Sequence, residues 1–90
     1  MIHLKVIKSK DYQVNICDED LIGRKINNTT ISESFYGERT SSDKALAELK
    51  KATLVNALGS EAVKLLKKVK GDLNTIKVNG VPHAQFFLIT

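Results

Sequence analysis

The N-terminal segment of the chain reads IHLKVIKSKDYQVNIC over residues 2–17, and it decides how the fold begins. Apolar residues alternate with polar ones on each side of its centre, at positions 2, 4 and 6 and again at positions 12, 14 and 16. A period of two is typical of strands that bury one face. The link formed by residues 9–11 is short and polar, as a tight turn requires. The pattern therefore predicts an antiparallel hairpin from Ile2 to Cys17.

The middle of the chain carries the signals of two helices. Side-chain oxygens at residues 40–42 can accept from the free amides of a helix start, and Asp43 suits the positive end of the helix dipole. Apolar residues then recur near a period of 3.6 as far as Leu58, where Gly59 is a typical terminator. A second helix is predicted from Ser60 to Gly71, with a stripe made of Ala62, Leu65, Leu66 and Val69.

The C-terminal segment predicts a second hairpin. Asn79 and Gly80 both tolerate positive φ, and they separate Thr75–Val78 from a run that ends at Ile89. Pro82 has no amide hydrogen, so we expect its strand at a sheet edge or at a bulge. Earlier, residues 21–26 suggest a short strand or turn before residues 27–30 break any pattern. The predicted fold class is α+β, an antiparallel sheet built from both hairpins and packed against two helices.

Composition limits the class of protein. A length of 90 residues, with 42% hydrophobic and 27% charged side chains, is ordinary for a single domain, which we expect to span residues 1–90. Cys17 is the only cysteine, so an internal disulfide is excluded. The chain shows neither a secretory leader nor an apolar run near the roughly 20 residues of a membrane span. These features predict a cytoplasmic protein in a reducing compartment, with no membrane role.

Charge is distributed unevenly along the chain. The net charge is +4, but seven lysines between positions 44 and 70 stand against two glutamates, a local excess of +5. Lysines opposite the apolar stripe of the second helix project outward together, and such a face suits phosphates. We therefore predict RNA or a ribonucleoprotein as the partner. The candidate contact residues are Lys50, Lys51, Lys64, Lys67 and Lys68. The alternative is a lysine face that only keeps the helix soluble.

Three motifs give the chain a family resemblance. They read CDEDLIG over residues 17–23, FYG over residues 35–37 and GVPHAQ over residues 80–85, with the two lysine-rich helices between the second and third. In order and spacing they resemble the archaeal domain of unknown function 424 family. The resemblance implies an archaeal, cytosolic protein and carries no known reaction or ligand. Asn79 stands where the family often has another glycine, a change that a turn tolerates.

His83 and Gln85 form a polar pair on the predicted C-terminal strand. A period of two places them on one face, opposite Ala84, Phe86 and Leu88. An imidazole beside an amide can contact a base edge, orient a water or bind a backbone group. This pair is therefore our candidate for a more specific RNA contact. The alternative is a histidine that satisfies backbone groups beside Pro82.

A second hypothesis is a small enzyme or ligand pocket centred on His83 and Gln85. His83 would act as acid or base, and Asp18 or Glu19 would hold the imidazole. Cys17 and Asp18 complete the candidate ligand-binding residues, although acids beside a thiol raise its pKa and predict a buried, unreactive cysteine. The acidic run lacks the spacing of calcium or zinc ligands, so we expect neither a metal nor a cofactor. Whether the chain is an enzyme is left open.

A third hypothesis is a protein-interaction module. An edge strand containing Pro82 would offer unpaired backbone groups, and exposed Phe35 and Tyr36 would offer apolar surface, to a partner or to a second copy of the chain. The strands show no aromatic ladder of the kind that single-stranded RNA platforms use. The aromatic residues are instead predicted in the core or at its rim.

Overall fold

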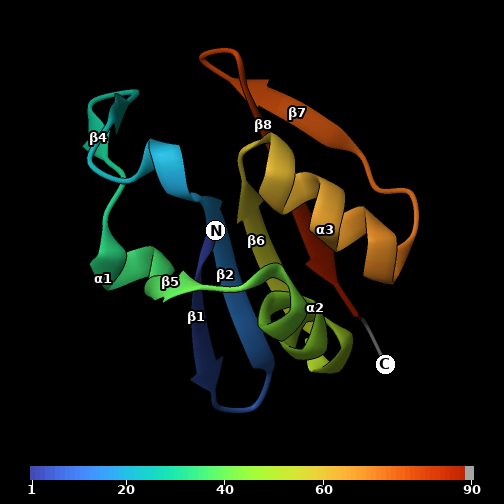
Figure 1. Ribbon diagram of the computed structural model, residues 1–90. Coiled ribbons are helices and arrows are strands. Elements are labelled where there is room, and N and C mark those ends of the chain that lie inside the picture. The colour runs from blue at the N-terminus through green and yellow to red at the C-terminus, as the bar shows by residue number, and fades with distance from the viewer. Residues whose placement is uncertain (89–90) are drawn as a thin grey trace.

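The computed structural model describes residues 1–88, which are built around a six-stranded mixed sheet (Figure 1). Its strands are β1 (Ile2–Lys8), β2 (Tyr12–Asp18), β5 (Glu38–Thr40), β6 (Leu54–Leu58), β7 (Thr75–Val78) and β8 (Val81–Phe87). In space they follow the order β5-β1-β2-β6-β8-β7. The β2–β6 pair is parallel and the other pairs are antiparallel. Both predicted hairpins, β1–β2 and β7–β8, are confirmed; the predicted strand end at Ile89 lies outside the described residues.

Two helices cover one face of this sheet (Figure 1). They are α2 (Ser42–Lys51), which begins where the Ser41 hydroxyl accepts from the Lys44 amide at 3.2 Å, and α3 (Ser60–Lys70). Their buried residues and the inward side chains of β1, β2, β6 and β8 form the main core, which includes Ile16, Leu49, Val55 and Leu66. The predicted α+β fold is therefore confirmed. Within residues 1–88, no helix is long and apolar enough to cross a membrane.

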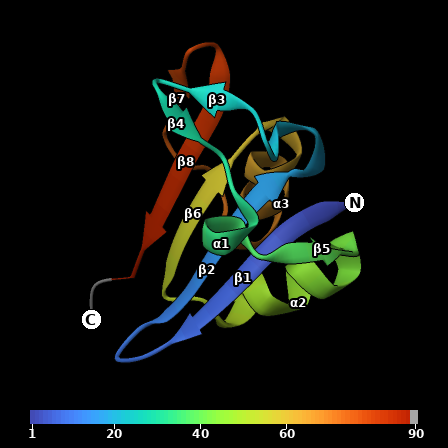
Figure 2. The same cartoon turned by 90° about the vertical axis from the view of Figure 1, so that its left-hand side faces the viewer.

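A second layer covers part of the opposite face, which Figure 2 shows toward the viewer. It consists of the 3₁₀ helix η1 (Glu19–Leu21), the hairpin β3 (Lys25–Ile26) and β4 (Thr29–Thr30), and the short helix α1 (Glu33–Tyr36). A smaller core lies beneath it, made of Cys17, Leu21, Ile26, Ile31, Tyr36 and Leu58. Asn27 and Asn28 both have positive φ, which suits the two-residue turn between β3 and β4. This hairpin was not predicted from residues 27–30.

The predicted helix to Leu58 is wrong, because α2 ends at Lys51 and residues 54–58 form the strand β6. Val55 and Ala57 face the helices while Asn56 and Leu58 face the other side, a period of two. The Thr53 backbone is already bound on both sides, since its amide donates to the Tyr12 carbonyl and its carbonyl accepts from Leu88. Pairing with β2 and β8 therefore overrides the helix propensity of leucine and alanine in this run.

Pro82 lies neither at a sheet edge nor at a bulge, although the sequence predicted one of the two. Its strand, β8, lies between β6 and β7. The Pro82 carbonyl accepts from the Gly59 amide at 2.8 Å, so its nitrogen also faces the point where β6 ends. There the Gly59 carbonyl accepts from Val63 in the first turn of α3. The missing amide hydrogen of Pro82 therefore leaves no carbonyl without a donor.

Candidate functional site

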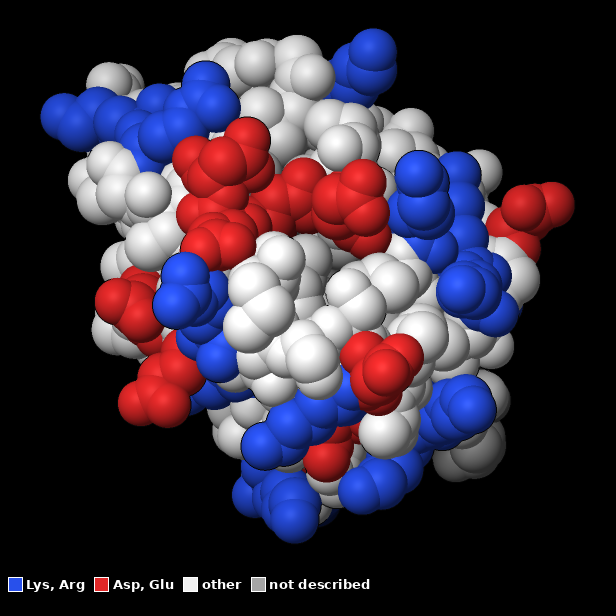
Figure 3. Space-filling view, in the orientation of Figure 1, with Lys and Arg blue, Asp and Glu red and all other residues white. Residues whose placement is uncertain are grey.

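The outer side of α3 carries a concentration of positive charge. Ala62, Val63 and Leu66 turn inward and are buried, which leaves the lysines of this helix facing outward or along its sides. Figure 3 shows basic atoms gathered over α3, at the right of the view, and along the lower edge of the molecule, while acidic atoms form a band in the upper half to the left of α3, near η1 and the start of α3. We call Lys50, Lys64, Lys67 and Lys68 the lysine surface.

These lysines have no acidic partner among residues 1–88. The ion pairs of this part of the chain leave out all four, whereas Lys51, the fifth candidate, lies 3.5 Å from Glu48. The two helices meet where the Lys70 amine donates to the Lys50 carbonyl at 3.4 Å. The end of α2 at Lys50 therefore lies beside the end of α3, whereas Lys51 is paired with an acid.

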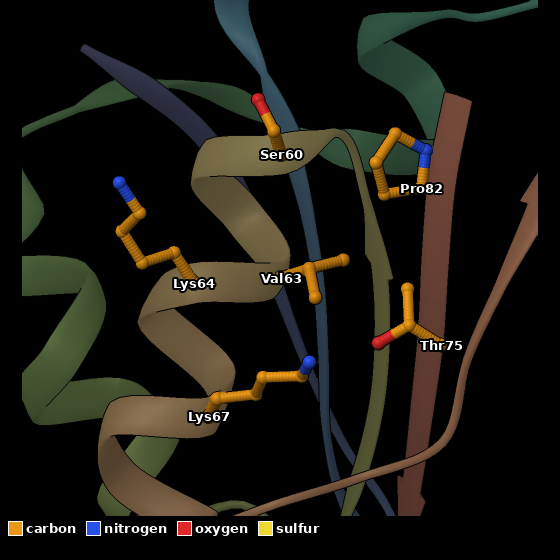
Figure 4. A pocket seen from close by; sticks show the side chains of 6 residues that line it. All are labelled: Ser60, Val63, Lys64, Lys67, Thr75 and Pro82. Carbon is orange, nitrogen blue, oxygen red and sulfur yellow. The ribbon is translucent and has the colours of Figure 1, made fainter. Parts of the chain in front are cut away.

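A cavity of about 350 Å³ opens beside this surface, between α3 and the β7–β8 hairpin. Its lining consists of Ser60, Val63, Lys64, Lys67, Thr75 and Pro82. In Figure 4, Val63 and Pro82 form apolar walls, the Lys67 amine turns toward the sheet and the Thr75 hydroxyl faces the helix. Lys64 points outward at the rim. This combination of apolar walls with ammonium and hydroxyl donors suits an anion attached to an apolar group.

The second polar region lies on the opposite face of the sheet. His83 and Gln85 share this face, as predicted, while Ala84 between them is buried on the helix side. The Nε2 atom of His83 lies 2.8 Å from Oδ1 of Asn56 on β6. An amide oxygen only accepts, so Nε2 carries the hydrogen and Nδ1 is left as an acceptor in the neutral ring. Partial burial lowers the pKa of His83, which favours the neutral form.

Two asparagines on this face were missed in the sequence. Register places Asn15 of β2, Asn56 of β6 and Gln85 of β8 side by side across the sheet. Asn15 is fully buried, and its amide donates to the Phe35 carbonyl at 3.0 Å, which fastens α1 to the sheet. The signal was present, because asparagine is a poor strand former and both residues interrupt apolar runs.

Cys17 is buried in the smaller core, as predicted. Its Sγ donates to the Asp18 carbonyl at 3.4 Å, and burial, with the charges of Asp18 and Asp20, raises its pKa to about 12. In register, Leu58 of β6 lies between Cys17 and His83. The two residues therefore do not form a nucleophile and base pair.

The acids do not reach His83, so the predicted support of the imidazole by Asp18 or Glu19 is wrong. Asp18 turns to the helix side, where its carboxylate accepts from the amides of Glu61 at 3.1 Å and Ala62 at 2.7 Å. Glu19 pairs with Arg39 at 2.8 Å, which lowers its pKa. Both carboxylates therefore join parts of the fold, because Asp18 binds the first turn of α3 and Glu19 pairs with a residue of β5.

The aromatic residues divide between core and surface. Tyr36 is only 6% exposed, which confirms the prediction of a core position and contradicts the exposure assumed for a protein-interaction surface. Phe35 is 44% exposed, and its ring meets that of Tyr36 edge to face at 4.7 Å. Phe87 is 57% exposed, although it was predicted in the core or at its rim. It follows Gln85 by two residues on β8 and therefore shares the face of His83.

Comparison with known proteins places the chain among uncharacterised relatives. A crystal structure described as an uncharacterized conserved protein from Methanopyrus kandleri is similar, with a TM-score of 0.82 and 26% sequence identity over 98% of this chain and 91% of that one. No curated protein matches. Residues 7–89 match the family described as "Protein of unknown function (DUF424)". The chain therefore belongs to the DUF424 family.

Proposed function

We propose that this protein is an RNA-binding module that contacts the phosphate backbone through the lysine surface. The observation that carries the proposal is a set of four lysines, two of which line one cavity, and none of which has an acidic partner among the described residues. Like charges held together cost free energy unless an anion joins them. The sugar–phosphate backbone of RNA supplies anions at a regular spacing, so it matches a surface of several lysines better than a single small ligand does.

The arrangement of charges on the surface supports binding of RNA in one orientation. The acidic band near η1 and the start of α3 borders the lysine surface in Figure 3 and would repel a phosphate backbone. An RNA strand is therefore directed toward the lower part of α3 and the end of α2. The cavity between Val63 and Pro82 then lies beside the backbone, with the Lys67 amine at its entrance.

Salt dependence tests this proposal. Binding of a fluorescent structured RNA is measured by anisotropy between roughly 50 and 400 mM salt, and each lysine that contacts a phosphate should add about 0.7 to 0.9 to the slope of log K against log salt. Changing Lys64, Lys67 and Lys68 together to glutamate should abolish binding. The matched control changes Lys5, Arg24 and Lys25 to glutamate, which alters the net charge by the same amount on or beside the layer that covers the opposite face of the sheet.

The results discriminate clearly. Retained binding by the control with loss in the α3 variant supports the lysine surface. Binding that is insensitive to salt, or no binding by the unmodified protein at 50 mM salt, contradicts the proposal. Equal weakening of both variants would indicate a response to net charge alone.

A protein partner is the competing proposal, because Phe35 and Ile76 expose apolar surface at 44% and 60%. The sheet edge beside β8 that is available for strand pairing is β7, whereas the sequence predicted that β8, which contains Pro82, would be the edge strand. Capture from a lysate with and without nuclease separates the two. A partner that survives nuclease, and is released by Phe35→Ser, favours protein recognition.

A further inference from the structure

We propose that the sheet face opposite α2 and α3 binds an unpaired base of RNA, held by Asn56, His83 and Gln85 and stacked on Phe87. The inference rests on the proposed RNA-binding function and deepens it, since the lysine surface holds phosphates but distinguishes no base.

The polar groups of this face retain hydrogen-bonding capacity. Asn56 uses its amide oxygen for the His83 ring at 2.8 Å, while no bond within residues 1–88 engages its amide nitrogen. The Nδ1 atom of His83 remains an acceptor. Gln85 is exposed, and its side-chain amide makes no hydrogen bond in the described part of the chain. The site therefore offers donors and acceptors from neighbouring strands in one row.

Those groups are held in position by the sheet. Asn56 and Gln85 are register partners on β6 and β8, and the bond between His83 and Asn56 fixes the ring tautomer. Asn56 is further flanked by Asn15, whose side-chain amide accepts from Gln13 and donates to the Phe35 carbonyl. A site placed on paired strands loses little conformational freedom on binding, which favours recognition by geometry.

Hollows lie on both sides of the bond between Asn56 and His83. One, of about 250 Å³, is lined by Asn74, Ile76, His83, Ala84 and Gln85. The other, of about 350 Å³, is lined by Thr29, Thr30, Ile31, Ser32, Phe35, Tyr36 and Asn56. These volumes lie at or below the lower end of pockets for drug-sized ligands, so they suit a single planar ring system.

Phe87 supplies the stacking surface. It is 57% exposed and lies two residues beyond Gln85 on the same face, a separation of about 7 Å along the strand. A base whose edge reaches Gln85 can therefore place its plane against the Phe87 ring. Stacking of unpaired bases on exposed strand aromatics, with hydrogen bonds to their edges, is the usual basis of recognition in single-stranded RNA.

The chemistry of this face favours a base over an apolar partner. An apolar surface packed on Asn56, His83 and Gln85 would bury their donors and acceptors without partners, which is unfavourable. A base presents donors and acceptors along its edge together with apolar faces, so it satisfies the amide row and the phenyl ring at once.

The two faces can act on one strand of RNA. Thr75 and Pro82 line the cavity beside the lysine surface, while Ile76 and His83, their neighbours in sequence, line the hollow on the opposite side. Only the β7–β8 ribbon separates the two cavities, and β7 is an edge strand. A backbone bound at Lys64 and Lys67 therefore needs to pass only around this edge to deliver a base to His83.

Uncharged ribonucleosides test the base site independently of the lysine surface. Adenosine, guanosine, cytidine and uridine are titrated to millimolar concentration into ¹⁵N-labelled protein and followed by NMR. We expect at least one of them to shift the signals of Asn56, His83 and Gln85 while leaving Lys64 and Lys68 unchanged.

With a single-stranded oligonucleotide of the preferred base, Gln85→Leu and Phe87→Ala should each weaken binding about tenfold without altering the salt slope. Ser9→Leu, on the exposed β1–β2 turn, is the matched control for an added leucine and should bind as the unmodified protein does.

The outcomes separate the two proposals. If no nucleoside shifts this face, and both variants bind RNA like the unmodified protein, the base site is overturned while the lysine surface stands. If nucleosides shift this face but the protein binds no RNA at low salt, the RNA-binding proposal fails and a base-binding pocket is supported. Nucleoside shifts confined to α3 would also overturn the site.

Discussion

Asp18 should contribute far more to stability than its place in an acidic turn suggests. It is 8% exposed, and its two carboxylate oxygens accept from two free amides in the first turn of α3, those of Glu61 and Ala62. Gly59 makes this approach possible, because a Cβ atom there would lie 2.3 Å from Cγ of Asp18. The perturbation is Asp18→Ala, which removes both acceptors and the charge at the positive end of the helix dipole.

The expected loss follows from these contacts. Hydrogen bonds to a charged group contribute about 1.5 to 3 kcal/mol each, and loss of a helix N-cap costs about 0.5 to 2 kcal/mol. These effects overlap because they describe the same two bonds, so we expect Asp18→Ala to lower the free energy of unfolding by about 3 kcal/mol. For a domain of this size, that loss corresponds to roughly 12 to 24 °C in melting temperature. Asp18→Asn keeps one oxygen acceptor and should lose about half as much.

Urea unfolding followed by far-UV circular dichroism measures the difference. The matched control is Asp20→Ala, an exposed acid in the same turn, which should change stability by less than about 0.5 kcal/mol. Gly59→Ala disturbs the same contact from the other side and should resemble Asp18→Ala. If Asp18→Ala is no more destabilising than Asp20→Ala, the carboxylate does not cap α3 and the reasoning fails.

Backbone fit and buried ionisable groups give three further predictions. Gly37→Ala should destabilise the protein by at least about 2 kcal/mol more than Gly71→Ala. Both glycines have positive φ, but only at position 37 would a Cβ atom meet the Leu4 carbonyl oxygen, at 2.1 Å. Thermal melts of the two variants provide the comparison. Burial raises the pKa of Cys17 from 9.0 and that of Tyr36 from 10.0, each to about 12. As pH rises, the unfolded chain therefore loses these protons before the folded chain does. The free energy of unfolding is unaffected below about pH 9 and should fall as pH rises toward 12, by up to about 1.4 kcal/mol per pH unit for each group. Urea titrations that show no such fall, or the same fall for Tyr36→Phe, would contradict this prediction. At pH 8 a pKa of about 12 leaves about one Cys17 side chain in 10⁴ as the thiolate. An aromatic disulfide reagent should therefore modify Cys17 at least about 100-fold more slowly in the folded protein than in urea. Equal rates would show that the thiol is accessible in the folded protein.

The candidate site was partly predictable. A period of two placed His83 and Gln85 on one face, and the lysines of α3 followed from the stripe opposite them. Asn56 was missed because its segment was assigned to a helix, in which it has no relation to Gln85. Asp18 was assigned to a ligand site because its partner amides at Glu61 and Ala62 are more than 40 residues away in sequence. Sequence spacing predicts which residues share a face of one element, but not which elements become neighbours.

Local sequence signals are sufficient for several elements, namely the β1–β2 hairpin, the Ser41 cap of α2, the body of α3 and the Asn79–Gly80 turn. Each depends on alternation, capping or turn chemistry within about ten residues, and such interactions act before the chain is folded. Such signals are not sufficient for residues 54–58, because a short apolar run satisfies its backbone equally well in a helix or a sheet. These residues form the strand between β2 and β8 through tertiary contacts. The hydrogen bonds offered by two distant strands settle that choice, and they bring Asn56 and His83 together on one face.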